Sequence, residues 1–172
     1  MAEDLHGRQL WDAVAGTLAA QASDQAALTS RAKDFLSMAT ISTTITGVIL
    51  NDKLFSVSEI ELSVGWIALA SVSLLLVYGA GIWALVPRQW SFAPDAADFY
   101  AVEQESPFAS EGELYRAMAE GYLLAGDGQS QLERNAESVK FIEMLVRIQS
   151  VGVIGLGAAA FILAFLVERA PR

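Results

Sequence analysis

Six polar or small residues in the stretch 33–51 could line a path through a membrane, because their spacing places them on one side of a helix. They are Lys33, Ser37, Thr40, Thr44, Gly47 and Asn51, which follow one another at steps of 4, 3, 4, 3 and 4 residues. At about 100° per residue, these positions share one helix face. Such a polar stripe is costly against lipid and favourable against water or another helix. The last five are therefore candidates for lining a pore or cavity that several subunits build together.

A second interpretation of the same stripe needs no pore. Serine and threonine hydroxyls in membrane helices often bond back to the carbonyl four residues earlier, or across to a neighbouring helix. Further hydroxyl residues, Ser42, Thr43 and Thr46, lie off the stripe. The sequence leaves both interpretations open.

Small residues recur on one face of a later apolar stretch, at Gly152, Gly155 and Ala159. Small side chains at this spacing let two helix backbones approach closely. A nucleotide-binding glycine loop would need a preceding strand, which the sequence does not predict. We therefore expect these three residues to pack against another helix, within or between subunits.

The sequence offers no obvious candidates for catalytic residues. The chain has no cysteine, and its single histidine is His6, near the N-terminus. The long apolar stretches contain no ionisable side chain, and no phosphate-binding loop or carboxylate pair is recognisable. The net charge of −9 argues against nucleic-acid binding. We expect no catalytic site, no metal, no cofactor and no nucleic-acid partner.

The elements that must position these residues are three stretches without charge. With 53% hydrophobic and 18% charged residues in a chain of 172, the composition indicates a small helical membrane protein, whose spans need roughly 20 apolar residues each. The predicted segments are an N-terminal helix (1–34), three transmembrane helices (35–51, 62–87 and 148–167), a short external loop (52–61), a cytoplasmic helical segment (88–147) and an external tail (168–172).

The distribution of basic residues predicts the orientation. With the N-terminus in the cytoplasm, eight Lys and Arg side chains lie inside and three outside, as the positive-inside tendency prefers. Lys33, Arg88 and Arg147 each stand at the inner end of a span, and Trp90 is close by. We interpret these four residues as interfacial anchors.

The fold class expected is all-α. The stretches 10–50 and 129–167 each read as one long helix without proline, so both would extend beyond the bilayer and could pack as an antiparallel cytoplasmic stalk. Alternatively, the N-terminal part lies on the membrane surface through Leu10, Trp11, Val14 and Leu18. Between the second and third spans, Ser110 and Glu113 have the spacing of a capping box that opens a helix.

Three short segments carry a resemblance to a known family. They are Ser30-Arg31-Ala32-Lys33-Asp34-Phe35-Leu36 before the first span, Ala84-Leu85-Val86-Pro87-Arg88 after the second, and Leu132-Glu133-Arg134-Asn135-Ala136-Glu137-Ser138-Val139-Lys140 before the third. In arrangement they resemble the SLATT-type and Pycsar-type small transmembrane effectors of bacterial anti-phage signalling. The resemblance implies a multi-pass protein of the bacterial inner membrane. It also implies a trigger, either a cyclic nucleotide second messenger or an associated sensor protein. Those families commonly have two spans, whereas three are predicted here.

Two functions from different classes follow. The leading hypothesis is a homo-oligomeric pore-forming or membrane-perturbing effector, because three helices alone cannot enclose a useful aqueous path. The alternative is a non-conducting membrane scaffold or anchor subunit that binds a cytoplasmic partner through its acidic helices. A phage-type holin fits the size and the number of spans, but not the long cytoplasmic segment.

Overall fold

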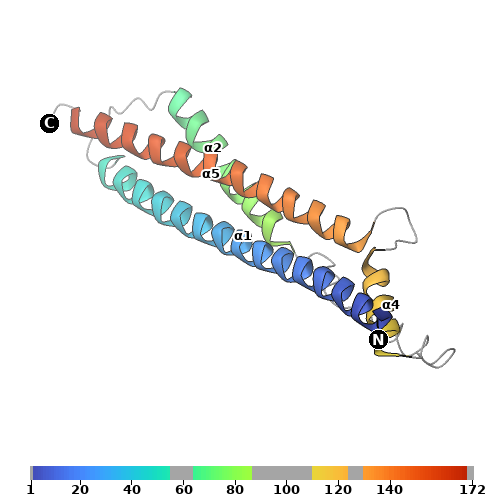
Figure 1. Cartoon of the computed structure of the whole chain (residues 1–172). Coiled ribbons are helices and arrows are strands. Elements are labelled where there is room, and N and C mark those ends of the chain that lie inside the picture. Colours follow the sequence, from blue (N-terminus) through green and yellow to red (C-terminus); the bar gives the residue numbers. More distant parts are fainter. Residues whose placement is uncertain (1, 55–63, 87–109, 124–129, 170–172) are drawn as a thin grey trace. The chain divides into compact units, whose positions relative to one another are not determined.

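The computed structural model describes residues 2–54, 64–86, 110–123 and 130–169, and these ranges contain four helices. The helices are α1 (Ala2–Leu54), α2 (Val64–Leu85), α4 (Glu111–Leu123) and α5 (Gln131–Arg169) (Figure 1). Because no strand occurs within the described ranges, the all-α prediction is confirmed for them. The chain divides into unit 1 (Met1–Ala26 and Pro87–Phe141) and unit 2 (Ala27–Val86 and Ile142–Arg172).

α1 is a single helix of 53 residues, which corresponds to about 80 Å at 1.5 Å per residue. Nothing in its sequence interrupts the backbone hydrogen bonds, because it contains no proline. Of the glycines of α1, Gly16 lies in an exposed position with open space around it. The long helix predicted over 10–50 is therefore confirmed, with longer ends.

α5 carries a seven-residue repeat of buried side chains. The buried positions at this spacing are Asn135, Ile142, Gln149, Leu156 and Leu163. A repeat of seven residues keeps one seam of a helix facing its neighbours, as in coiled coils. A complete capping box opens the helix: Glu133 N–H donates to Ser130 Oγ at 3.2 Å, and Ser130 N–H donates to Glu133 Oε2 at 2.9 Å.

In unit 2, α1, α2 and α5 form a three-helix bundle around the buried residues Ala39, Val77 and Leu156. Gln149 Nε2 donates to Ala32 O at 3.0 Å, and Leu156 packs beside Ala39 further along both helices. α1 and α5 therefore run in the same direction, with α2 antiparallel to both (Figure 1). The prediction that the long helices over 10–50 and 129–167 pack antiparallel is wrong. The chain runs along unit 2 in one direction in α1, in the opposite direction in α2 and again in the first direction in α5, so α1 and α5 are parallel.

Unit 1 joins the first part of α1 to α4 and to the start of α5. Val14, Leu18, Ala119 and Tyr122 form its buried cluster, and Leu132 packs against them. Leu10 and Trp11 also contact this cluster. The apolar face that could have lain on a membrane surface is thus covered by protein in unit 1, which argues against the membrane-surface interpretation of this part of α1.

Two details fix the contact between α1 and α4. Gly7 lies directly against the backbone of Gly112, where a Cβ would collide with the Gly112 carbonyl. At the start of α4, Glu113 N–H donates to Ser110 Oγ at 3.3 Å, so the predicted N-terminal cap is present. The first contact requires glycine at position 7, and the second requires a short polar side chain at the start of α4.

Two helices, Gly65–Leu85 and Gln131–Leu166, are long and apolar enough to cross a membrane. In each, only 28% of the most apolar window is buried within the protein. Large apolar side chains accordingly point outward, with Leu75, Ile154 and Phe161 exposed by 73%, 72% and 74%. The predicted first span, 35–51, is not one of these two helices, because six of its residues are serine or threonine.

Several predictions fall on residues outside the described ranges. Arg88 and Trp90 belong to 87–109, and most of the external loop belongs to 55–63. Asn51 lies in α1, but its side chain is outside the described set. These predictions remain as stated from the sequence.

Candidate membrane-facing site

The polar stripe of α1 lies on the outward side of unit 2. Ser37, Thr40, Thr44 and Gly47 are all exposed, and so is Lys33. The stripe therefore takes no part in the buried core of the three-helix bundle. A polar face on the outside of a bundle is available to water or to another protein chain.

The hydroxyls of this stripe bond to their own helix. Ser37 Oγ donates to Lys33 O at 3.0 Å, and Thr44 Oγ1 donates to Thr40 O at 2.9 Å. Such bonds to the carbonyl four residues earlier reduce the cost of placing a hydroxyl against lipid. The backbone bonds expected if the stripe needs no pore are thus present. The outward position of the stripe is equally compatible with a pore lining.

Thr40 connects the stripe to α2. Its hydroxyl donates to Leu36 O at 2.9 Å and lies 3.0 Å from the hydroxyl of Tyr78. Because Thr40 has one hydroxyl proton and gives it to Leu36 O, Tyr78 is the donor in the second bond. This bond holds α1 beside α2 at the edge of the stripe.

Apolar residues flank the stripe on the same outward side of α1. Met38, Ile41, Ile45 and Val48 are large and exposed. The exposed half of α1 in unit 2 thus has one polar strip and one apolar strip side by side. In an assembly within a bilayer, the two strips would favour different surroundings, lipid for one and protein or water for the other.

The small residues of α5 lie against α2. A Cβ on Gly152 would lie 2.8 Å from Ser73 O and 2.9 Å from Val77 N, and a Cβ on Gly155 would collide with Ser73 Oγ. Ala159 is buried, and its carbonyl accepts a hydrogen bond from Trp66 Nε1 at 2.7 Å. All three thus face α2 of the same chain in unit 2.

Gln149 is a polar group in the middle of this bundle. Its side chain is fully buried at 0% exposure, and its amide nitrogen bonds the carbonyl of Ala32. Its Oε1 atom is buried without a hydrogen-bond partner among the described residues. Gly81 provides the space for this amide, because a Cβ there would lie 2.5 Å from Gln149 Nε2. A buried acceptor without a partner costs about 1–3 kcal/mol.

Arg147, at the predicted inner end of the third span, forms a local contact. Arg147 Nη2 donates to Glu143 Oε1 at 2.6 Å, and both side chains are largely solvent-accessible. An exposed pair at this spacing contributes about 0.3–0.5 kcal/mol. Within the described part of the chain, no group of three or more His, Asp or Glu side chains is placed to hold a metal ion.

Comparison with family models, with curated proteins and with solved structures finds no match. The arrangement in unit 2 must therefore be interpreted from its own geometry. Sequence reasoning did not identify Tyr78, Gln149 or Ser73 as contact residues. The seven-residue repeat through Gln149 was a usable signal for that residue, whereas the contact of Tyr78 depends on the register between α1 and α2.

Proposed function

We propose that the protein is an integral membrane protein whose unit 2 crosses the bilayer with three helices. Two of the helices meet the length and apolarity that a span requires. The second half of α1 lies beside both of them at the same level, since Ala39 packs with Val77 and Leu156. A bilayer that surrounds α2 and α5 would therefore surround this part of α1 as well.

The orientation follows from charge. The N-terminus would lie in the cytoplasm with unit 1, because basic residues are concentrated in the segments before the first span and between the second and third. The resemblance to bacterial effectors supports a location in the bacterial inner membrane.

Several copies of the chain would assemble into a pore with the α1 stripe toward the axis. The observation that carries this proposal is the outward position of Ser37, Thr44 and Gly47 on a bundle that also exposes many large apolar side chains. In a lone molecule this strip would face lipid, which is unfavourable for its polar groups. Assembly around the stripes removes this contact and encloses a polar path. The effector function in anti-phage defence rests on the family resemblance alone.

A non-conducting scaffold is the second candidate. It is favoured by the hydroxyl bonds within α1, because hydroxyls that already bond to carbonyls at Lys33, Leu36 and Thr40 need no water. In that case the stripe would be a contact between helices, and the acidic segment 88–147 would bind a cytoplasmic partner.

Single cysteines can distinguish these candidates, because the natural chain has none. Thr44→Cys places a thiol on the stripe, and Ile45→Cys places one on the neighbouring apolar strip, which is equally outward in a single molecule. In liposomes with measurable ion flux, a charged water-soluble thiol reagent should block flux through Thr44→Cys and leave Ile45→Cys unchanged.

Other results would contradict the pore. Tight vesicles that contain reconstituted protein under every condition, including a panel of cyclic nucleotides, would favour the scaffold. Equal reaction of both cysteines would place this part of α1 in water and contradict the proposal that 35–51 crosses the membrane. Flux that depends on one cyclic nucleotide would support the trigger implied by the resemblance.

A further inference from the structure

Two different edges border the polar stripe of α1 in unit 2. Going round the helix from Ser37, Thr40 lies about 60° to one side and Ile41 about 40° to the other, because each residue adds about 100°. The Thr40 hydroxyl lies 3.0 Å from the Tyr78 hydroxyl, so α2 stands at that edge. The opposite edge is the apolar strip of α1, which consists of the exposed residues Met38, Ile41, Ile45 and Val48. The stripe thus separates α2 from the apolar strip.

The edge beside α2 also has exposed apolar side chains. Around α2, Leu75 and Ile82 lie about 60° and 40° from Tyr78, on the side away from the buried Val77. They are exposed by 73% and 59%. We call the row of exposed residues on this side the α2 flank, and it consists of Ile67, Ser71, Leu75 and Ile82. Unit 2 therefore has an uncovered apolar surface on each side of the stripe.

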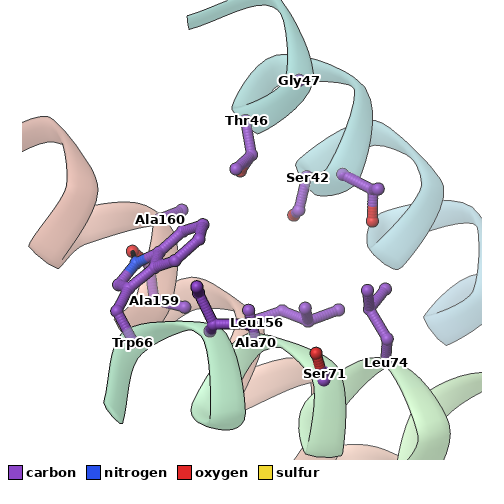
Figure 2. A pocket seen from close by; sticks show the side chains of 12 residues that line it. Ser42, Thr46, Gly47, Trp66, Ala70, Ser71, Leu74, Leu156, Ala159 and Ala160 are labelled. Carbon is purple, nitrogen blue, oxygen red and sulfur yellow. Dashed lines mark hydrogen bonds between the residues drawn. The ribbon is translucent and has the colours of Figure 1, made fainter. Parts of the chain in front are cut away.

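Part of the α2 flank borders a pocket. The pocket has a volume of about 260 Å³ and lies between α1, α2 and α5 in unit 2 (Figure 2). Small residues such as Gly47 and Ala70 leave the space open, and Ile67 and Ser71 of the flank belong to its lining. Leu75, one turn beyond Ser71, lies outside the lining. Leu75 therefore belongs to the more continuous part of the flank.

The two edges also differ in charge. Lys33 and Asp34 are consecutive in α1 and are both exposed, but they point about 100° apart. Lys33 lies in the stripe, toward the edge beside α2. Asp34 lies four residues before Met38 and so stands at the start of the apolar strip. Because consecutive residues do not face each other on a helix, each of these two charges is directed toward a different side of unit 2.

A pore with the stripes toward its axis must close through these two edges. In a ring generated by rotation, one edge of each copy meets the opposite edge of the next copy, and equivalent residues lie at the same depth. We propose that the copies assemble head-to-tail, with the apolar strip of α1 packed against the α2 flank of the next copy. The inference rests on the proposed pore.

The charges agree with this order of assembly. In a head-to-tail ring, Asp34 of one copy lies on the side of Lys33 of the next copy, and the two charges are opposite. Contact between two identical edges would instead bring two aspartates or two lysines together. Complementary charges across an interface favour the correct pairing over the wrong one. Charge therefore selects the head-to-tail contact, while the two apolar rows provide the buried area.

The packing within one copy predicts which residues meet. Ala39 of α1 packs with Val77 of α2, and the two helices run in opposite directions, so Ile41 lies at about the depth of Leu75. Rotation about an axis along the bilayer normal keeps these depths, so Ile41 of one copy faces Leu75 of the next copy. Ile154 lies two residues from the α5 member of the same cluster and is as exposed as Leu75, by 72% against 73%. However, α5 borders neither edge of the stripe, which makes Ile154 a matched control.

Disulfide crosslinking tests this pairing, because the natural chain has no cysteine. A variant with both Ile41→Cys and Leu75→Cys is reconstituted into vesicles and oxidised, and so is a control with Ile41→Cys and Ile154→Cys. Each copy of the first variant can bond to two neighbours. We therefore expect a ladder of covalent multimers that ends at the number of copies in the ring, whereas the control stays monomeric.

Three outcomes would overturn the proposal. The first is the absence of a ladder from the Ile41→Cys and Leu75→Cys variant while its ion flux is retained. The second is dimer formation by Ile41→Cys alone, because two apolar strips would then face each other. The third is an equal ladder from the Ile154→Cys control, which would show contacts without the predicted order.

Charge exchange gives a second test that leaves the apolar contact in place. Added to the variant that forms the ladder, Lys33→Asp and Asp34→Lys each bring like charges together and should lower the yield of multimers about two- to fivefold, as for an exposed ion pair. Both changes together restore opposite charges and should recover the yield. Asp34→Lys also places a like charge near Arg31 of the same helix, and the double exchange retains this, so recovery reports the contact between copies. A double exchange with no recovery would refute the charge pairing.

Failure of the pore and failure of the head-to-tail order give different results. Flux that a thiol reagent blocks at Thr44→Cys, without a ladder from Ile41→Cys and Leu75→Cys, would keep the pore and contradict the order of assembly. A ladder in vesicles that never conduct ions would keep the head-to-tail assembly and contradict the pore.

Discussion

The contact between α5 and α2 in unit 2 predicts opposite outcomes for two glycine-to-alanine changes in the same helix. Gly152 lies against the α2 backbone, so that a Cβ there would be 2.8 Å from Ser73 O and 2.9 Å from Val77 N. Gly157 is exposed, and a Cβ there would meet nothing within 4 Å. We expect Gly152→Ala to destabilise unit 2 and Gly157→Ala to leave it unchanged or slightly more stable.

The magnitude follows from the two effects that a new methyl group has. Alanine is favoured over glycine in a helix by about 0.5–1 kcal/mol, and this gain is common to both variants. Overpacking adds a cost of about 1–3 kcal/mol at Gly152 alone, because two of the three nearest atoms, Ser73 O and Val77 N, belong to backbone that cannot rotate away, while the third is a methyl group of Val77. The difference between the free energies of unfolding of the two variants should therefore be about 1–3 kcal/mol, independent of helix propensity.

The measurement should report on unit 2 rather than on the whole chain. Trp66 is suited to this, because its indole bonds Ala159 O within the same unit. With the other three tryptophans replaced by phenylalanine, unfolding in mixed micelles with increasing sodium dodecyl sulfate can be followed by the fluorescence of Trp66. Each glycine variant is compared with this single-tryptophan parent.

Equal stability of Gly152→Ala and Gly157→Ala would refute the reasoning. It would mean that α5 does not approach α2 at Gly152, and that the register between these helices differs from the one described. A loss of stability in both variants would instead place Gly157 at a contact with another chain. Comparing the two variants at several protein concentrations identifies that case, since only an intermolecular contact depends on concentration.

Three further predictions follow from buried groups. Gly7→Ala should destabilise unit 1 by about 1–3 kcal/mol through its contact with Gly112, whereas Gly16→Ala should not, as judged by amide exchange in α1. Gln149→Leu should leave the stability of unit 2 unchanged or raise it by about 1 kcal/mol, because it removes an acceptor without a partner; a large loss in detergent unfolding would contradict this. Burial raises the pKa of the Tyr122 phenol above its ordinary value of 10.0. As the pH rises, the unfolded chain therefore loses this proton before the folded protein does. The contribution of the phenol to the free energy of unfolding is complete below about pH 10 and falls as the pH rises further. The variant Tyr122→Phe should lose less stability than the natural protein over this alkaline range.

Much of the secondary structure could be predicted from the sequence because its causes are local. The absence of proline over 2–54 allows one continuous α1, and Ser110 with Glu113 predicts the start of α4. The apolar content of Val64–Leu85 identifies a candidate span without reference to any other helix. The polar stripe of α1 also follows from spacing alone, since residues at steps of three and four share a face.

The tertiary structure decided how these helices meet. The sequence did not reveal that Tyr78 bonds Thr40, that Gly81 makes room for Gln149, or that Ser73 faces Gly152, because each pairing depends on the axial register of two helices. Several registers can bury a similar apolar surface, and only the fit of small residues against a neighbouring backbone selects one of them.

The same register separates two kinds of hydroxyl that look alike in the sequence. Thr44 and Thr46 are two residues apart on one helix, yet Thr44 bonds its own backbone on the outward face and Thr46 lines the pocket. Their spacing determined that they point in different directions, since two residues correspond to about 200° around a helix. The packing of the three helices decided which side of α1 faces α2 and α5. Small residues let the helices approach closely at Gly152 and leave a space at Ala70.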